Sequence, residues 1–364
     1  MVLLVATVEK SGIDRYSQEL SRRVSVPTMQ SRRYLSLRDS FRLVRQLRQT
    51  SHQIHLTSQH FARHGLFLGK PFIVTVHDLV RICFPFTSET IPEKLGLRLD
   101  ALGLKKAQHI IAVSECTKAD LMHYLGIPED KITVIYNGVD HTVFRPVHER
   151  RFDFPYLLYV GTERPRKNLG TLLRAFALLK TDTATFGELK LVKVGGAGRT
   201  DKFRHKTLSE VRRLGLEDQV IFVDGVSDQS LASYYSSAAA LIMPSLYEGF
   251  GLPLIEAMAC GCPVIASNSS SLPEVAGNAA LLIDPLDSYG LSEAMRRVTT
   301  DYALKQELVK KGLGRAKQFS WERTARETMQ LYHRIEADLA TDKRRIMPSQ
   351  DAGEPIGVPP LRRR

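Results

Sequence analysis

The sequence predicts an α/β fold built from two Rossmann-like, doubly wound domains. Short β-rich runs alternate with helical patterns over most of the 364 residues, and this order is typical of parallel sheets covered by helices. The length suits two domains of roughly 100–200 residues each. A polar, charged stretch runs from Arg145-Pro146 to Pro155, and we place the linker there. Ligands of such folds bind where strands end, so we expect a cleft between the domains.

The first domain spans residues 1–148. Its expected strands are Val2–Thr7, Phe72–Val76, His109–Val113 and Ile132–Ile135. Gly12 is expected in the loop after the first strand, before a helix near Arg15–Arg23. Thr117–Leu125 is expected to be a helix, for which Ser114 is a good N-cap.

The second domain spans residues 149–320. Its expected strands are Tyr156–Val160, Leu189–Val194, Val220–Val223, Ala240–Met243 and Val264–Ala266. Its expected helices are Asn168–Leu179, Asp201–Leu214, Gln229–Ser236, Pro253–Cys260 and Leu286–Val298. A helical stretch then runs from Asp301 to about Leu339, with a break near Phe319-Ser320. Residues 341–364 are polar, Pro-rich and basic, so we expect a disordered tail there.

The composition is that of an ordinary globular protein, with 43% hydrophobic and 25% charged residues. No apolar run approaches the roughly 20 residues needed to span a bilayer. The cysteines, Cys83, Cys116, Cys260 and Cys262, lack the spacing of a zinc or redox pair. We therefore expect reduced cysteines and a cytoplasmic protein.

The net charge of +12 favours an anionic partner. Arginine is dense between Arg22 and Arg48. This segment could rest on an anionic membrane surface, which would make the protein peripheral on the inner face of the plasma membrane, or it could be a solvated basic face without a partner. Nucleic acid is disfavoured, because the chain lacks aromatic–basic interleaving and zinc-finger spacing.

The stretch Glu248-Gly-Phe-Gly-Leu-Pro-Leu-Ile-Glu256 is the most informative part of the chain. Pro253 suits the first position of a short helix, and Gly261 suits the position after its end. Free N–H groups at the helix start would form an anion site beside Gly249–Leu252. The carboxylates on either side suit sugar and ribose hydroxyls. This order of groups fits a nucleotide-sugar.

Two other strand ends carry groups suited to phosphate. The stretch Gly161-Thr-Glu-Arg-Pro-Arg-Lys-Asn168 places three cations before a predicted helix. Val194-Gly-Gly-Ala-Gly198 is a second glycine-rich strand end. A glycine cluster alone is weak evidence, but cations at a helix start strengthen it. Surface charges and plain turn residues are the alternative interpretation.

These motifs closely resemble glycosyltransferase family 4, whose members are retaining enzymes with the GT-B fold. In the second half, the resemblance rests on Gly161–Lys167, Tyr235–Ala240, Pro244–Ser267 and Leu272-Pro-Glu-Val275. In the first half it rests on the less specific stretches Thr75–Leu79, Ala112–Lys118 and Val134–Asp140. Phe319-Ser-Trp321 and the helix over about 321–338 match the family's closing helix, which crosses back onto the N-terminal domain.

The resemblance implies a role for each motif. Glu248 would hydrogen-bond the donor sugar, His77 would face its reacting carbon, and Glu256 would bind the ribose. The expected catalytic residues are therefore Glu248 and His77. The expected ligands of the donor sugar and phosphate are Lys167, Arg166, Arg164, Phe250, Gly251, Leu252 and Gly12. The expected nucleotide-binding residues are Glu256, Val226 and Gly195.

The sequence departs from the family at Thr162, where many members carry an arginine. Either Arg164 or Arg166 is then expected to make the second phosphate contact. No Asp-x-Asp pair occurs, which agrees with a metal-independent reaction, and we expect no metal and no cofactor besides the donor. Cations and the helix start would stabilise the departing diphosphate.

The predicted function is transfer of a hexose, with mannose favoured, to a glycan or lipid-linked acceptor in polysaccharide or glycoconjugate synthesis. GDP-mannose is the favoured donor, because the phosphate loop looks like that of its users, and a UDP-hexose is the alternative. The competing function is a non-catalytic GT-B subunit or a nucleotide-sugar-binding scaffold at the membrane surface. A nucleotide-cofactor oxidoreductase is disfavoured, because Ser11-Gly12-Ile13 does not supply the Gly-x-Gly-x-x-Gly turn.

Overall fold

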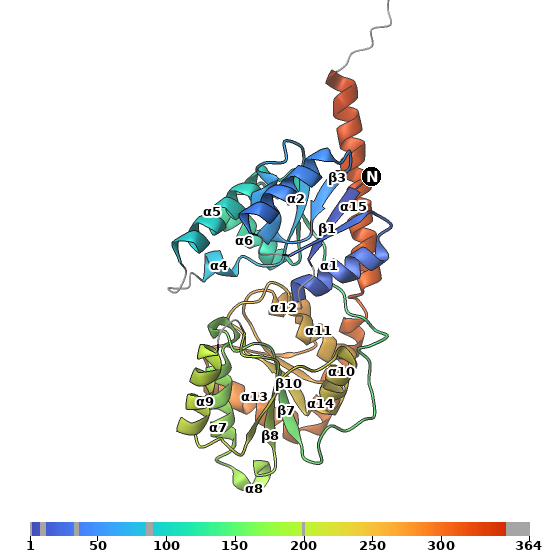
Figure 1. Ribbon diagram of the computed structural model, residues 1–364. Coiled ribbons are helices and arrows are strands. Elements are labelled where there is room, and N and C mark those ends of the chain that lie inside the picture. Colours follow the sequence, from blue (N-terminus) through green and yellow to red (C-terminus); the bar gives the residue numbers. More distant parts are fainter. Residues whose placement is uncertain (1, 8–11, 33–35, 85–89, 199–200, 347–364) are drawn as a thin grey trace, which may run out of the picture.

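The computed structural model describes residues 2–7, 12–32, 36–84, 90–198 and 201–346. The chain forms two lobes, each built on a parallel six-stranded sheet (Figure 1). In the N-terminal lobe the strand order is β2-β1-β3-β4-β5-β6. Its strands are β1 (Val2–Thr7), β2 (Thr28–Ser31), β3 (Gln53–Leu56), β4 (Phe72–Val76), β5 (His109–Ala112) and β6 (Ile132–Val134). Its helices are α1 (Gly12–Arg23), α2 (Leu37–Gln49), α3 (Ala62–Gly65), α4 (Val80–Cys83), α5 (Ile91–Lys106) and α6 (Glu115–Leu125).

The C-terminal lobe repeats this plan with the strand order β12-β11-β10-β7-β8-β9. Its strands are β7 (Tyr156–Val160), β8 (Lys190–Val194), β9 (Val220–Val223), β10 (Ala240–Met243), β11 (Val264–Ser267) and β12 (Leu281–Ile283). Its helices are α7 (Leu169–Leu179), α8 (Thr183–Phe186), α9 (Lys202–Arg213), α10 (Asp228–Ser237), α11 (Leu252–Ala259), α12 (Leu272–Ala276), α13 (Ser288–Thr300) and α14 (Tyr302–Ala316).

Both faces of each sheet are covered, which is why central strands such as β7 and β10 are mostly apolar. In the C-terminal lobe, α7, α9 and α13 pack on one face and α10, α11 and α12 on the other. In the N-terminal lobe, residues of α2, α3, α5 and α6 share one core cluster with the sheet. The opposite face carries α1 and the C-terminal helix α15 (Trp321–Ile346).

Helix α15 returns from the C-terminal lobe to the N-terminal one, as Figure 1 shows. Its buried side chains Leu331, Tyr332 and Ile335 pack against Ile73 of β4 and Ile111 of β5. The predicted break before this helix is confirmed, because α14 ends at Ala316 and α15 begins at Trp321. The doubly wound two-lobe fold and the crossing helix are therefore as predicted.

Several details differ from the predictions. Gly12 does not lie in a loop but is the first residue of α1. The tail was expected to be disordered from residue 341, yet the backbone of α15 stays helical to Ile346. The residues Thr341 to Ile346 contain no glycine or proline, and a helix can propagate through them without a hydrophobic face. Residues 347–364 lie outside the described part of the chain.

The cysteines are free thiols, as predicted. Cys260 and Cys262 are buried in the core of the C-terminal lobe, and burial raises the pKa of the Cys260 thiol to about 12. Within the described ranges, no helix is both long and apolar enough to cross a bilayer.

Candidate active site

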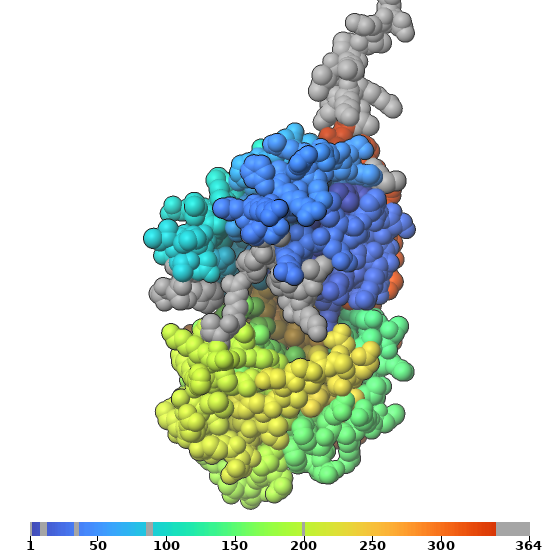
Figure 2. Space-filling view, in the orientation of Figure 1, coloured from blue at the N-terminus to red at the C-terminus, as the bar shows by residue number. Residues whose placement is uncertain are grey.

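The N-terminal lobe, blue to teal in Figure 2, is in contact with the green and yellow C-terminal lobe, and the segments that follow β4 and β10 meet between them. The loop after β10 presses its Gly249 against the N-terminal lobe, so that a Cβ atom there would lie 1.7 Å from the carbonyl oxygen of His77. The Gly249 carbonyl accepts hydrogen bonds from Ser114 Oγ at 2.7 Å and Thr117 Oγ1 at 3.3 Å. Only glycine permits this approach, and the contact fixes the loop that carries Glu248.

Glu248 is buried on this loop and is held by three donors. Lys167 Nζ lies 2.6 Å from Oε1, and Arg166 Nη1 lies 2.9 Å from Oε2. Ser245 Oγ also donates to Oε1, at 2.7 Å. Burial would raise the pKa of the Glu248 carboxyl, but the Lys167 and Arg166 cations outweigh burial and lower that pKa to about 2. Glu248 is therefore ionised at any physiological pH.

Two cations lie beside Glu248. Arg166 and Lys167 come from a 3₁₀ turn (Pro165–Lys167) after β7 and both pair with the Glu248 carboxylate. Burial lowers the pKa of the Lys167 ammonium, while the charges of Glu248 and Asp78 oppose that shift. Cations on a turn and the N–H groups at a helix start are groups that can bind an anion.

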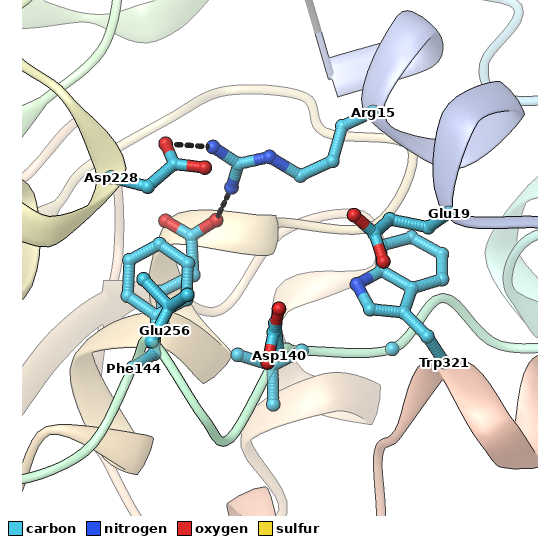
Figure 3. A pocket seen from close by; sticks show the side chains of 10 residues that line it. Arg15, Glu19, Asp140, Phe144, Asp228, Glu256 and Trp321 are labelled. Carbon is cyan, nitrogen blue, oxygen red and sulfur yellow. Dashed lines mark hydrogen bonds and ion pairs between the residues drawn. The ribbon is translucent and has the colours of Figure 1, made fainter. Parts of the chain in front are cut away.

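Glu256 lies in α11 and is buried. Tyr235 of α10 donates its hydroxyl to Glu256 Oε2 at 2.9 Å. Arg15 of α1, from the other lobe, pairs with Oε1 and also with Asp228 at 2.5 Å (Figure 3). Burial raises the pKa of Glu256 although Arg15 opposes it. The two carboxylates of the motif thus differ, because Glu248 has two close cations and Glu256 has one.

The glycine-rich strand ends after β7 and β8 touch one another. Gly195 has φ +112°, and a Cβ there would lie 2.9 Å from the carbonyl oxygen of Gly161. The side chain of Arg164 lies beside Gly198 on the same pair of loops. Arg164 and Arg166 therefore occupy different places, since Arg166 is bound to Glu248.

A buried ion cluster links these loops to the loop after β9, which contains Val226. Lys193 Nζ lies 2.8 Å from Glu163 Oε1, and neither side chain is exposed to solvent. Arg204 pairs with Glu163 and reaches Asp224 at 3.1 Å. The sequence patterns did not reveal a role for Lys193, Glu163 or Arg204. A basic residue within the apolar strand β8 was the signal that could have identified the cluster.

The remaining predicted site residues lie on both lobes. Phe250 is buried, Gly251 is the N-cap of α11 with φ 99°, and Leu252 is the first residue of that helix. Val226 is half-buried and packs on the core of the C-terminal lobe. Gly12 begins α1, three residues before Arg15.

The side chain of His77 is directed into its own lobe. Its Nε2 lies 2.9 Å from the Thr57 carbonyl oxygen and therefore donates to it. Its ring packs edge-on against Tyr16 at a centroid distance of 4.8 Å. The backbone carbonyl of His77 thus faces the Gly249 loop, whereas its ring nitrogen Nε2 bonds within the N-terminal lobe.

A further contact between the lobes involves Glu274 of α12. Its carboxylate accepts from the backbone N–H groups of Glu115 at 2.7 Å and Cys116 at 3.2 Å, at the start of α6. Ser114 caps the same helix by accepting from the Thr117 N–H at 3.0 Å, as its sequence predicts. In the part of the chain that the structure describes, no cluster of three or more His, Cys, Asp or Glu side chains is placed to hold a metal ion.

Two Rossmann-like lobes, a helix that crosses back, and a cation-rich cleft between strand ends define a protein of the GT-B class. Comparison with known proteins agrees. The family model described as Glycosyltransferase Family 4 matches residues 3–143, and the model described as Glycosyl transferases group 1 matches residues 140–315. The chain belongs to glycosyltransferase family 4.

Similar proteins include enzymes of carbohydrate synthesis. The O-antigen chain mannosyltransferase B of Escherichia coli is 33% identical over 239 residues, which are 63% of this chain and 61% of that protein. The chain thus covers less than two thirds of that relative. Sucrose-phosphate synthase from Thermosynechococcus elongatus has a TM-score of 0.75 at 25% identity, covering 93% of this chain and 99% of the other. Anabaena HepE in complex with UDP-glucose has a TM-score of 0.76 at 17% identity, covering 91% and 99%, and shows the fold alone.

Proposed function

We propose that this chain is a retaining hexosyltransferase that transfers a hexose, with mannose favoured, from a nucleotide-sugar to a glycan or lipid-linked acceptor. GDP-mannose is the donor we favour, and a UDP-hexose is the alternative. The observation that carries the proposal is the buried cluster of Glu248, Lys167 and Arg166 at the cleft. The name of the E. coli relative, a mannosyltransferase, supports the choice of mannose.

The chemistry follows from the charges in the cleft. Transfer builds negative charge on the departing diphosphate, and in this proposal Lys167, Arg166 and the N–H groups at the start of α11 stabilise it. Glu248 pairs with both cations. A bound donor would offer its phosphates to the cations and its sugar hydroxyls to Glu248. This scheme needs no metal, and same-face attack on the sugar would retain configuration.

Donor binding is the direct test. A panel of GDP- and UDP-sugars is screened by thermal unfolding, and the true donor at about 100 times its Kd should add roughly 2.7 kcal/mol to the free energy of unfolding. GDP-mannose is expected to give the largest shift. A panel in which no nucleotide-sugar changes the unfolding temperature would contradict the proposal.

Transfer itself is tested at Glu248. Glu248→Gln removes the charge that binds Lys167 and Arg166, and we expect turnover to fall at least a hundredfold, about 2.7 kcal/mol of transition-state stabilisation. Glu293→Gln, in an exposed pair with Arg296 on α13, is the control and should behave as the wild type. A wild-type protein that releases free sugar from the donor, or transfers it to an acceptor, is an enzyme. A protein that binds the donor and does neither is a non-catalytic scaffold.

We also propose that the basic face of the N-terminal lobe rests on an anionic membrane. Helix α2 exposes Leu37 and Phe41 beside Arg38, Arg42 and Arg45, the composition of an interfacial helix. Each cation near an anionic surface contributes about 1 kcal/mol. Replacing the three arginines by glutamine should therefore abolish co-sedimentation with vesicles rich in phosphatidylserine, and unchanged sedimentation would exclude this surface.

A further inference from the structure

Arg15 connects the two lobes inside the cleft. It comes from α1 and pairs with Glu256 and Asp228 of the C-terminal lobe, and its guanidinium lies 5.6 Å from the centre of the Phe144 ring. The pair is well protected, with 4% of the Glu256 side chain and 27% of the Arg15 side chain exposed. Figure 3 shows the guanidinium directed at both carboxylates. Removing either partner of such a pair leaves a buried charge without its counter-ion, which is costly.

Both oxygens of Glu256 are occupied. Oε2 accepts from Tyr235, a neighbour in the same lobe, and Oε1 is bound to Arg15, from the other lobe. Tyr235 lies in the buried core beside α11, so it cannot leave without disrupting that core. The described residues that line the cavity include Arg15 and Glu256 but not Tyr235. A ligand hydroxyl that enters the cavity would therefore reach Glu256 on the side that Arg15 holds.

The surrounding cavity favours hydroxyls over phosphate. The described residues that line it include the carboxylates of Glu19, Asp140, Asp228 and Glu256, and Arg15 is the one cation among them. A phosphate would meet several carboxylates here, whereas a ribose diol would donate hydrogen bonds to them.

We propose that Arg15 competes with ribose at the donor site, because it holds Glu256 until the two ribose hydroxyls of a nucleotide displace it. This inference rests on the proposed function. Binding of a nucleotide through Glu256 would therefore break the ion pair between Arg15 and Glu256. Arg15 therefore weakens binding of ribose-bearing nucleotides and leaves nucleotides without the hydroxyls unaffected.

The test compares ligands with and without the ribose diol. Titration calorimetry gives the Kd of GDP and of 2′,3′-dideoxy-GDP, and likewise of UDP and its dideoxy analogue. The ratio of the dideoxy Kd to the ribose Kd measures the preference for the diol and is insensitive to changes in overall charge. In Arg15→Gln this ratio should rise at least fivefold over the wild type, because the diol no longer competes for Glu256.

A matched control variant supports the interpretation. Arg296→Gln removes an arginine from an exposed pair on α13 and should leave the ratio unchanged. A circular dichroism melt of each variant confirms that it is folded.

The outcomes are distinct. A ratio in Arg15→Gln that equals or falls below that of the wild type overturns the role of Arg15, while binding of the nucleotides themselves leaves the proposed function standing. If neither GDP nor UDP binds the wild-type protein, the proposed function and this inference fall together.

Discussion

The two carboxylates of the Glu248–Glu256 motif pair with the protein's own cations. Glu248 binds Lys167 and Arg166, and Glu256 binds Arg15. Buried carboxylates without partners would be strongly disfavoured. The groups that we propose to contact the donor are therefore also paired with one another, and a donor would have to exchange partners with them.

The free energy of unfolding at acidic pH should depend on the pairing of Glu248 with Lys167 and Arg166. The pKa of Glu248 is about 2 in the folded protein against an ordinary value of 4.5. A lowered folded pKa stabilises the protein above the unfolded pKa, and this contribution is lost as the pH falls toward the folded pKa. The free energy of unfolding of the wild type, minus that of Glu248→Gln, should fall by about 2 kcal/mol between roughly pH 5 and pH 3.

Urea unfolding at each pH gives these values. Glu293→Gln serves as the control, because Glu293 is half-exposed at 49%, and its difference from the wild type should stay nearly flat. A flat difference for Glu248→Gln as well would show that the cations do not hold Glu248 ionised.

For single residues, the sequence could identify the site residues of one motif, but not the residues from distant segments with which they pair. The positions of Glu248, Glu256 and Lys167 follow from local patterns of glycine, proline and charge. Arg15 and Asp228 are 213 positions apart in the chain, and only the docking of two lobes brings them together. A pattern within one segment carries no information on such a pair.

At the scale of elements, the loop after β10 and the start of α6 form one unit. The loop gives its Gly249 carbonyl to Ser114 and Thr117, and α12 gives the Glu274 carboxylate to the first N–H groups of α6. An anion at a helix N-terminus is favourable. These contacts hold the Glu248 loop against the N-terminal lobe.

Gly249→Ala should move the loop after β10 away from the N-terminal lobe. The added Cβ would collide with the His77 carbonyl oxygen at 1.7 Å, a backbone atom that cannot move aside without shifting β4 or the loop. We expect at least a tenfold loss of transfer and a loss of stability of about 1–3 kcal/mol. Gly314→Ala in α14 is the control, because no atom lies within 4 Å of its added Cβ. Wild-type transfer by Gly249→Ala would show that the lobes need not be this close.

Short and polar elements were the ones that the sequence did not reveal. The edge strand β2 has the sequence TMQS and no fully buried residue, so it lacks an apolar run. Helix α2 buries only Leu43 and Leu47 among its arginines, and β12 is three residues long. Elements with strong periodicity, such as β7, α7 and β10, were identified, because burial on both faces leaves a clear apolar signal.

At the scale of the whole molecule, α15 packs against β1 and α1, which lie far from it in the sequence. Trp321, its first residue, is buried against Leu4 of β1 and against Tyr16 and Leu20 of α1. Its ring lies 6.2 Å from that of Tyr16 in an edge-on arrangement. Farther along α15, the Tyr332 hydroxyl lies 2.5 Å from His55 Nδ1 in β3. One face of the N-terminal sheet is therefore covered by α15, the last helix in the described part of the chain.

Trp321→Ala should destabilise the N-terminal lobe more than the C-terminal one. The change removes a large side chain from a closed cluster, and such truncations cost about 3–5 kcal/mol because the cavity collapses only partly. Hydrogen exchange is the measurement, because it separates the lobes. Amides of β1 and β4 should exchange faster, whereas those of β8 and β10 should change little. Phe41→Ala, at a side chain that is 82% exposed, should leave exchange as in the wild type. Equal acceleration in both lobes would mean that the two unfold as one unit, and no acceleration would mean that α15 does not stabilise the sheet on which it packs.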